Sequence, residues 1–139
     1  MNNQGLLTIG YSTLANRGKN IQFLKEVENL VVIQNPDNEQ LPEFASNISV
    51  IELKNRGVAK SRNKVLAAAK TKYLLFGDDD VDFKIAAILR VISYLEAHPD
   101  VSIVLTQAVD EDGQLRKSYP LKSHNLALRN SAKAATYEI

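Results

Sequence analysis

The chain has 139 residues, about the length of one domain, with 45% hydrophobic residues, 24% charged residues and a net charge of +1. This balance gives no chain-wide reason for binding nucleic acid or a membrane surface, and no nucleic-acid partner is expected. The absence of cysteine excludes disulfides, thiol catalysis and thiolate metal sites from the chain. We recognise no signal peptide and no membrane span, so a cytoplasmic protein is expected.

Short apolar runs alternate with helical patterns along the chain. Strands are predicted at residues 6–9, 30–33, 49–53, 73–76 and 101–109, and helices at residues 21–27, 58–69 and 83–97. Residues 35–44 are expected to form a loop. Strand–helix alternation implies right-handed crossovers and a mostly parallel sheet flanked by helices. The predicted class is therefore α/β, with residues 1–139 as a single domain.

Three consecutive carboxylates, Asp78, Asp79 and Asp80, follow the predicted fourth strand. Ligands of open α/β sheets bind outside the carboxyl ends of the strands, so a site is expected here. If the backbone is still extended, Asp78 and Asp80 point to one side and Asp79 to the other. Two carboxylates about 4 Å apart repel by roughly 1 kcal/mol in water, and a hard divalent cation would reverse that sign. The alternative is a solvated acidic turn, with Asp82 capping the next helix.

Arg62 helps to distinguish a cation site from a solvated acidic turn. In the predicted helix, an apolar face contains Val58, Val65, Leu66 and Ala69, and Arg62 lies between Val58 and Leu66. Its side chain should then point toward the sheet, close to the acidic triplet, because the start of the helix and the end of the fourth strand lie at one edge. A permanent guanidinium charge needs an anionic partner. Two interpretations stay open: a buried ion pair that holds the helix down, or a cationic group offered to a diphosphate.

The stretch NRGVAKSRNKVLAAAKTKYLLFGDDDVDF, residues 55–83, resembles the signature region of the GT-A glycosyltransferases of family 2. In that pattern an asparagine and a glycine follow a strand, an Arg-Asn pair opens a helix with a run of small residues, and the next strand ends in Asp-x-Asp. A weaker similarity extends over residues 6–109 through LLTIGYSTLANR and LVVIQNPDNE. The resemblance implies a GT-A-like, mostly parallel sheet flanked by helices and truncated after the donor-binding half.

The resemblance also implies site residues. Asp78 and Asp80 would form the metal-binding motif for Mg²⁺ or Mn²⁺, with Asp80 the direct ligand and Asp78 facing the ribose or sugar. A loop after the first strand would hold the base and ribose, with Tyr11 stacking on the base or else lying in the core. Asp37 would replace the acid that reads the base, although QNPDN departs from the family's Asp pair followed by Ser. The implied nucleotide-sugar-binding residues are Tyr11, Ser12, Thr13, Asp37, Arg62, Asp78 and Asp79.

The implied activity is glycosyl transfer from a UDP- or GDP-sugar to a hydroxyl of a carbohydrate or lipid-linked acceptor. The family's general base would lie beyond Ile139, so we expect this chain to be the donor-binding part, with little transfer by itself. The alternative is a non-catalytic nucleotide-sugar-binding or scaffold module. A receiver-like signalling domain fits poorly, because the first strand ends in GYST and not in an acid pair.

Overall fold

The computed structural model describes residues 5–114 and 133–138. The chain divides into two compact units, Met1–Phe83 and Lys84–Ile139, which are described separately. The single-domain organisation expected from the sequence stays a prediction. Within the described residues, no helix has the length and apolar character needed to cross a membrane.

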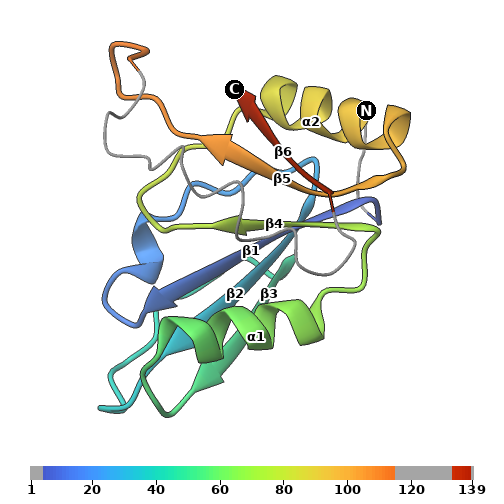
Figure 1. Cartoon of the computed structure of the whole chain (residues 1–139). Coiled ribbons are helices and arrows are strands. Elements are labelled where there is room, and N and C mark those ends of the chain that lie inside the picture. Colours follow the sequence, from blue (N-terminus) through green and yellow to red (C-terminus); the bar gives the residue numbers. More distant parts are fainter. Residues whose placement is uncertain (1–4, 115–132, 139) are drawn as a thin grey trace. The chain divides into compact units, whose positions relative to one another are not determined.

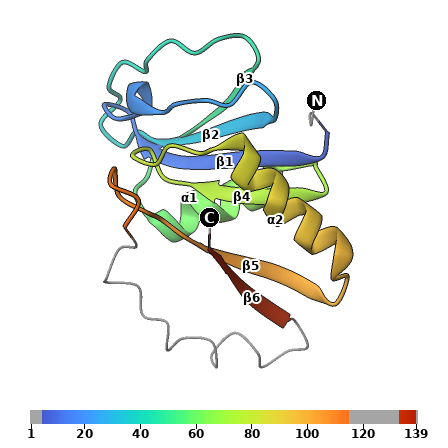
Figure 2. The same ribbon diagram turned by 90° about the horizontal axis from the view of Figure 1, so that it is seen from above.

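The first unit contains a four-stranded sheet in the order β3-β2-β1-β4, and every neighbouring pair is parallel (Figures 1 and 2). The mostly parallel α/β fold predicted from the sequence is thereby confirmed. The elements are β1 (Leu7–Leu14), the 3₁₀ helix η1 (Gly18–Asn20), β2 (Glu28–Gln34), β3 (Ile48–Leu53), α1 (Val58–Ala68) and β4 (Tyr73–Gly77).

Strand register determines what lies at the carboxyl edge. Leu14 of β1 is opposite Gln34 of β2, which is opposite Leu53 of β3, so three strands end together. In β4 the last residue, Gly77, is opposite Tyr11, three positions before the end of β1. The chain that leaves β4 therefore runs alongside the last residues of β1.

One part of the core lies between the central strands and α1. Leu30, Val32 and Val65 form its buried centre on the α1 side of the sheet. Gly10 of β1 faces Val65 so closely that a β-carbon at this position would overlap the Val65 side chain. The helix can therefore rest directly on β1. Partly buried side chains complete this cluster: Ile51, Leu53, Ala68 and Leu74.

The predicted apolar face of α1 is confirmed at Val65 and wrong at Val58 and Leu66. The buried residues of the helix are Ser61 and Val65, whereas Val58 is 57% and Leu66 is 62% exposed.

Ser61 and Val65 are four positions apart, about one turn, so they lie on the same side of the helix. On that side Val65 packs against Gly10 and Ser61 is hydrogen-bonded to Ser12, both in β1. Arg62 therefore lies beside the contact face and not at its centre.

Two other predictions near β1 are also wrong. The helix expected at residues 21–27 is absent, and η1 is followed there by an irregular segment. The Asn29 side chain donates hydrogen bonds to the carbonyl oxygens of Leu24 (2.8 Å) and Val27 (3.1 Å). Two carbonyl groups of the irregular segment thereby have hydrogen-bond donors although no helix forms. In addition, residues 11–13, expected in a loop after the first strand, form the carboxyl end of β1.

The second unit contains α2 (Ile85–Ala97), β5 (Val101–Gln107) and β6 (Lys133–Glu138), with β5 and β6 parallel. The sequence predicted α2 and β5 but not β6. Asp82 does not cap α2: the N-cap residue is Lys84, and no side chain caps the helix. The cap prediction fails because the helix begins two residues later than expected.

The contact between Gly10 and Val65 gives a test of the fold. We expect Gly10→Ala to lower the free energy of unfolding by about 1–3 kcal/mol, because the added methyl group would overlap Val65. In a Val65→Ala background the methyl group has room, so the same change should cost less. Urea denaturation of the four proteins measures both effects, and an equal loss in the two backgrounds would contradict this packing.

Candidate functional site

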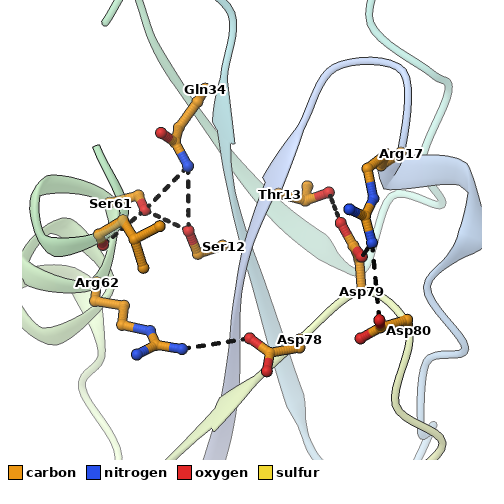
Figure 3. Close-up of polar contacts among 10 residues, drawn as sticks. Ser12, Thr13, Arg17, Gln34, Ser61, Arg62, Asp78, Asp79 and Asp80 are labelled. Carbon is orange, nitrogen blue, oxygen red and sulfur yellow. Dashed lines mark hydrogen bonds and ion pairs between the residues drawn. The ribbon is translucent and has the colours of Figure 1, made fainter. Parts of the chain in front are cut away.

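The acidic triplet lies in a turn directly after β4. The turn includes a hydrogen bond of 3.4 Å from the Val81 N–H to the Asp78 carbonyl. The extended backbone on which the alternate-side expectation depended is therefore absent. Asp79 and Asp80 both face Arg17, whereas Asp78 faces Arg62, so the expected alternation of sides is wrong (Figure 3). The Asp79 side chain is 8% exposed, while those of Asp78 and Asp80 are 62% and 73% exposed. The turn thus presents two carboxylates to solvent and buries the third.

Asp79 is held by two residues from the β1 region (Figure 3). The Thr13 hydroxyl donates to Oδ2 at 2.6 Å, and the Arg17 guanidinium forms an ion pair with Oδ1. Both carboxylate oxygens are engaged, and Thr13 is buried. Burial of a carboxylate is costly unless it is paired and hydrogen-bonded, and both conditions are met. Asp79 therefore anchors the turn to β1.

Arg62 lies next to the triplet, as the sequence predicted. Its Nη2 is 3.3 Å from Oδ1 of Asp78, and Figure 3 shows the side chain reaching from α1 toward the turn. The pair is accessible, with 47% of the Arg62 and 62% of the Asp78 side chain exposed. An exposed ion pair stabilises a fold by only about 0–1 kcal/mol. The structure therefore does not contain the buried helix-to-turn bridge that was one of the two interpretations.

Three polar side chains meet where α1 begins, between β1, β2 and the helix. Ser12 and Ser61 are hydrogen-bonded to each other through their hydroxyls, and Nε2 of Gln34 is 3.4 Å from each hydroxyl oxygen (Figure 3). The Ser12 side chain is thus directed at α1. Ser12 is one of the site residues expected from the sequence, whereas Gln34 and Ser61 are not.

Tyr11 belongs to the core. Its side chain is fully buried, with edge contacts to the rings of Phe23 (centroids 5.5 Å apart) and Phe83 (6.3 Å). Burial, with a smaller effect from the charge of Asp82, raises the pKa of the Tyr11 hydroxyl to about 12. Of the two alternatives for Tyr11, the structure supports the core. In this conformation the ring is not available for stacking on a base.

Asp37 lies on the loop after β2, where its Oδ2 is 3.1 Å from Nη2 of Arg56. Both side chains are exposed, at 66% and 68%. The buried Asn35 side chain organises this loop, because its amide donates to the Glu39 carbonyl and its oxygen accepts from the Glu39 N–H, both at 2.8 Å. Asp37 is thus accessible beyond the strand next to β1, but it does not contact the acidic turn or Arg62 through any described interaction.

A divalent cation fits part of this arrangement. No group of three or more metal-binding side chains is present among the described residues. Asp78 and Asp80 supply two exposed carboxylates, and the nearest cationic atom to Asp80 is Nη2 of Arg17, 3.9 Å away. Mg²⁺ typically takes one or two protein carboxylates and completes its octahedron with water and phosphate oxygens. The number of exposed carboxylates thus matches what Mg²⁺ takes, while in this conformation Asp78 faces Arg62 and Asp80 faces Arg17 (Figure 3).

Other polar residues at this edge were not singled out from the sequence. Gln34 is the polar last residue of the apolar strand β2, and a polar residue at a strand end could have indicated a site residue. Arg17 lies three residues after β1, so only the fold brings it to Asp79. Ser61 is polar, and the apolar pattern of α1 therefore gave no sign that its side chain is buried.

Comparison with known protein families gives a match to the model described as "Glycosyl transferase family 2", over residues 15–137. Comparisons with curated proteins and with solved structures give no match.

The anchoring role of Asp79 can be separated from the role of its exposed neighbour. We expect Asp79→Ala to lower the free energy of unfolding by about 1–3 kcal/mol, because the buried Thr13 hydroxyl loses its 2.6 Å hydrogen bond and Arg17 loses its closest carboxylate. Asp80→Ala, at an exposed position of the same turn, should stay within about 0.5 kcal/mol of the unmodified chain. Urea denaturation measures both. Equal effects of the two substitutions would contradict the anchor.

Proposed function

Since the chain belongs to glycosyl transferase family 2, we propose that it binds a nucleoside-diphosphate sugar at the carboxyl edge of β1, β2 and β4 for transfer of the sugar to an acceptor hydroxyl. The observation that carries the proposal is the meeting of Arg62 with an exposed acidic turn at this edge. Such an edge is where ligands bind in open α/β sheets. The donor is a UDP- or GDP-sugar, and residues 1–139 act as its binding domain.

We assign Asp80, with Asp78, to a bound Mg²⁺ or Mn²⁺. Support comes from the exposure of both carboxylates and from the long distance, 3.9 Å, between Asp80 and its nearest cationic partner. When bound, the cation would offset the negative charge that develops on the departing nucleoside diphosphate. Asp79 stays with Thr13 and Arg17, and its part in donor binding is to hold the turn in place.

The remaining residues orient the donor. Arg62 donates hydrogen bonds to the diphosphate, which a guanidinium can approach with two parallel N–H groups. Its exposed contact with Asp78 is weak enough to be exchanged for a phosphate. Asp78 then faces the ribose or sugar, and Asp37 with Ser12 lies toward the nucleoside. Tyr11 supports β1 from the core beneath these residues.

The proposed reaction is a displacement at the anomeric carbon. The acceptor hydroxyl loses its proton to a general base and forms the new C–O bond, while the bond to the phosphate oxygen breaks and its electron pair leaves with the nucleoside diphosphate. The acceptor is a carbohydrate or a lipid-linked hydroxyl. The absence of cysteine fits a reducing compartment, and we place the activity in the cytoplasm.

Titration calorimetry with UDP and GDP, in Mn²⁺ and in chelator, tests this proposal. We expect the chain to bind at least one nucleotide, and to bind it more tightly with Mn²⁺. Asp80→Ala should weaken binding in Mn²⁺ on the order of tenfold or more, because it removes the proposed metal ligand. Asp82→Ala, which removes another exposed carboxylate from the same segment, is the matched control and should bind like the unmodified chain.

Two results would contradict the proposal. Equal affinity in Mn²⁺ and in chelator would remove the metal from it. Absence of binding to either nucleotide under both conditions would remove the nucleotide-sugar site. A transfer assay with the same chain distinguishes an active glycosyltransferase from a module that only binds the donor.

A further inference from the structure

Gln34 is a buried polar residue at the end of a buried apolar strand. It is the last residue of β2 and 7% exposed, after four hydrophobic residues that are also buried. Placing a side-chain amide in such a position is costly unless its donors and acceptor are paired. The hydrogen bonds of the Gln34 amide must therefore offset the free-energy cost of burying it.

The Gln34 amide joins α1 to the sheet. Its oxygen accepts a hydrogen bond of 2.6 Å from the N–H of Gly57, the N-cap residue of α1. Its nitrogen is 3.4 Å from the hydroxyl oxygens of Ser12 in β1 and Ser61 in α1. Gly57 has φ of +140°, a backbone conformation that other residues rarely adopt. This conformation bends the chain just before α1 and directs the Gly57 N–H at the Gln34 side chain.

Arg62 depends on this junction. It follows Ser61, whose side chain is fully buried and is hydrogen-bonded to Ser12. The contact between Arg62 and Asp78 is exposed and therefore holds the helix only weakly. The buried contacts of the first turn, and not the ion pair, fix how far Arg62 extends toward the acidic turn.

We propose that Gln34 is a positioning residue of the nucleotide site, which acts through the first turn of α1 to hold Arg62 where a diphosphate binds. The inference rests on the proposed function. It adds a residue that touches neither nucleotide nor metal in this account. Because positioning depends on sub-ångström placement, loss of the amide should reduce the contribution of Arg62 without abolishing the fold.

A double-mutant cycle tests the coupling. Binding of UDP and GDP in Mn²⁺ is measured by calorimetry for the unmodified chain, Gln34→Leu, Arg62→Ala and the double variant. We expect Gln34→Leu to weaken binding about tenfold when Arg62 is present, and to have little effect when Arg62 is already alanine. The matched control is Asn29→Leu, which removes another buried amide from β2 at the opposite end of the strand. It should lower thermal stability while leaving affinity unchanged.

The outcomes separate this inference from the proposed function. An unmodified chain that binds a nucleotide while Gln34→Leu binds it equally well would overturn the inference alone. So would an equal loss of affinity with and without Arg62, since Gln34 would then act by another route. No binding by the unmodified chain would overturn the proposed function and this inference with it. If Gln34→Leu does not fold, Gln34→Asn, which keeps an amide too short to span the same contacts, completes the cycle.

Discussion

Parallel pairing of β1 with both β2 and β4 is the constraint on which the rest of the structure depends. Because the strands run in one direction, the polar residues that follow each of them collect at a single edge. The register then places the acidic turn beside Thr13, and α1 begins where β1 and β2 end. Gly10 allows α1 to lie close to β1, so the helix carries Arg62 to that edge as part of a packed core.

The three carboxylates of the acidic turn differ in burial and in their contacts with cationic side chains, and this difference gives them different roles. Asp79 is buried and fully paired, so it contributes position, whereas Asp78 and Asp80 stay accessible and have weaker cationic contacts. Two guanidiniums from separate parts of the chain, Arg17 and Arg62, moderate the repulsion among the three carboxylates. A metal and a diphosphate would take over part of that role, since the diphosphate competes with the carboxylates for Arg62 and the metal competes with Arg62 for Asp78.

The sequence predicted the strands of the first unit well, because a strand covered on both faces reads as a continuous apolar run, as at residues 30–33. It also predicted that Arg62 lies next to the acidic triplet, because the start of α1 and the end of β4 lie at the same edge of a parallel sheet. It failed where several packings fit one pattern: α1 buries Val65 as predicted, but it buries Ser61 and leaves Val58 and Leu66 exposed. The burial of Asp79 could not be predicted, because Thr13 and Arg17, which hold it, are distant in the sequence.

Paramagnetic broadening by Mn²⁺ tests the central claim most directly, because it locates a bound metal on the chain. In backbone amide spectra with UDP or GDP present, a small addition of Mn²⁺ should reduce the signals of residues 77–81 and of Arg62 first, and Mg²⁺ in excess should restore them. The acidic stretch at Asp110, Glu111 and Asp112, in the second unit, serves as an internal comparison. Broadening strongest at that stretch, or spread evenly over the chain, would contradict a nucleotide and metal site at the turn after β4.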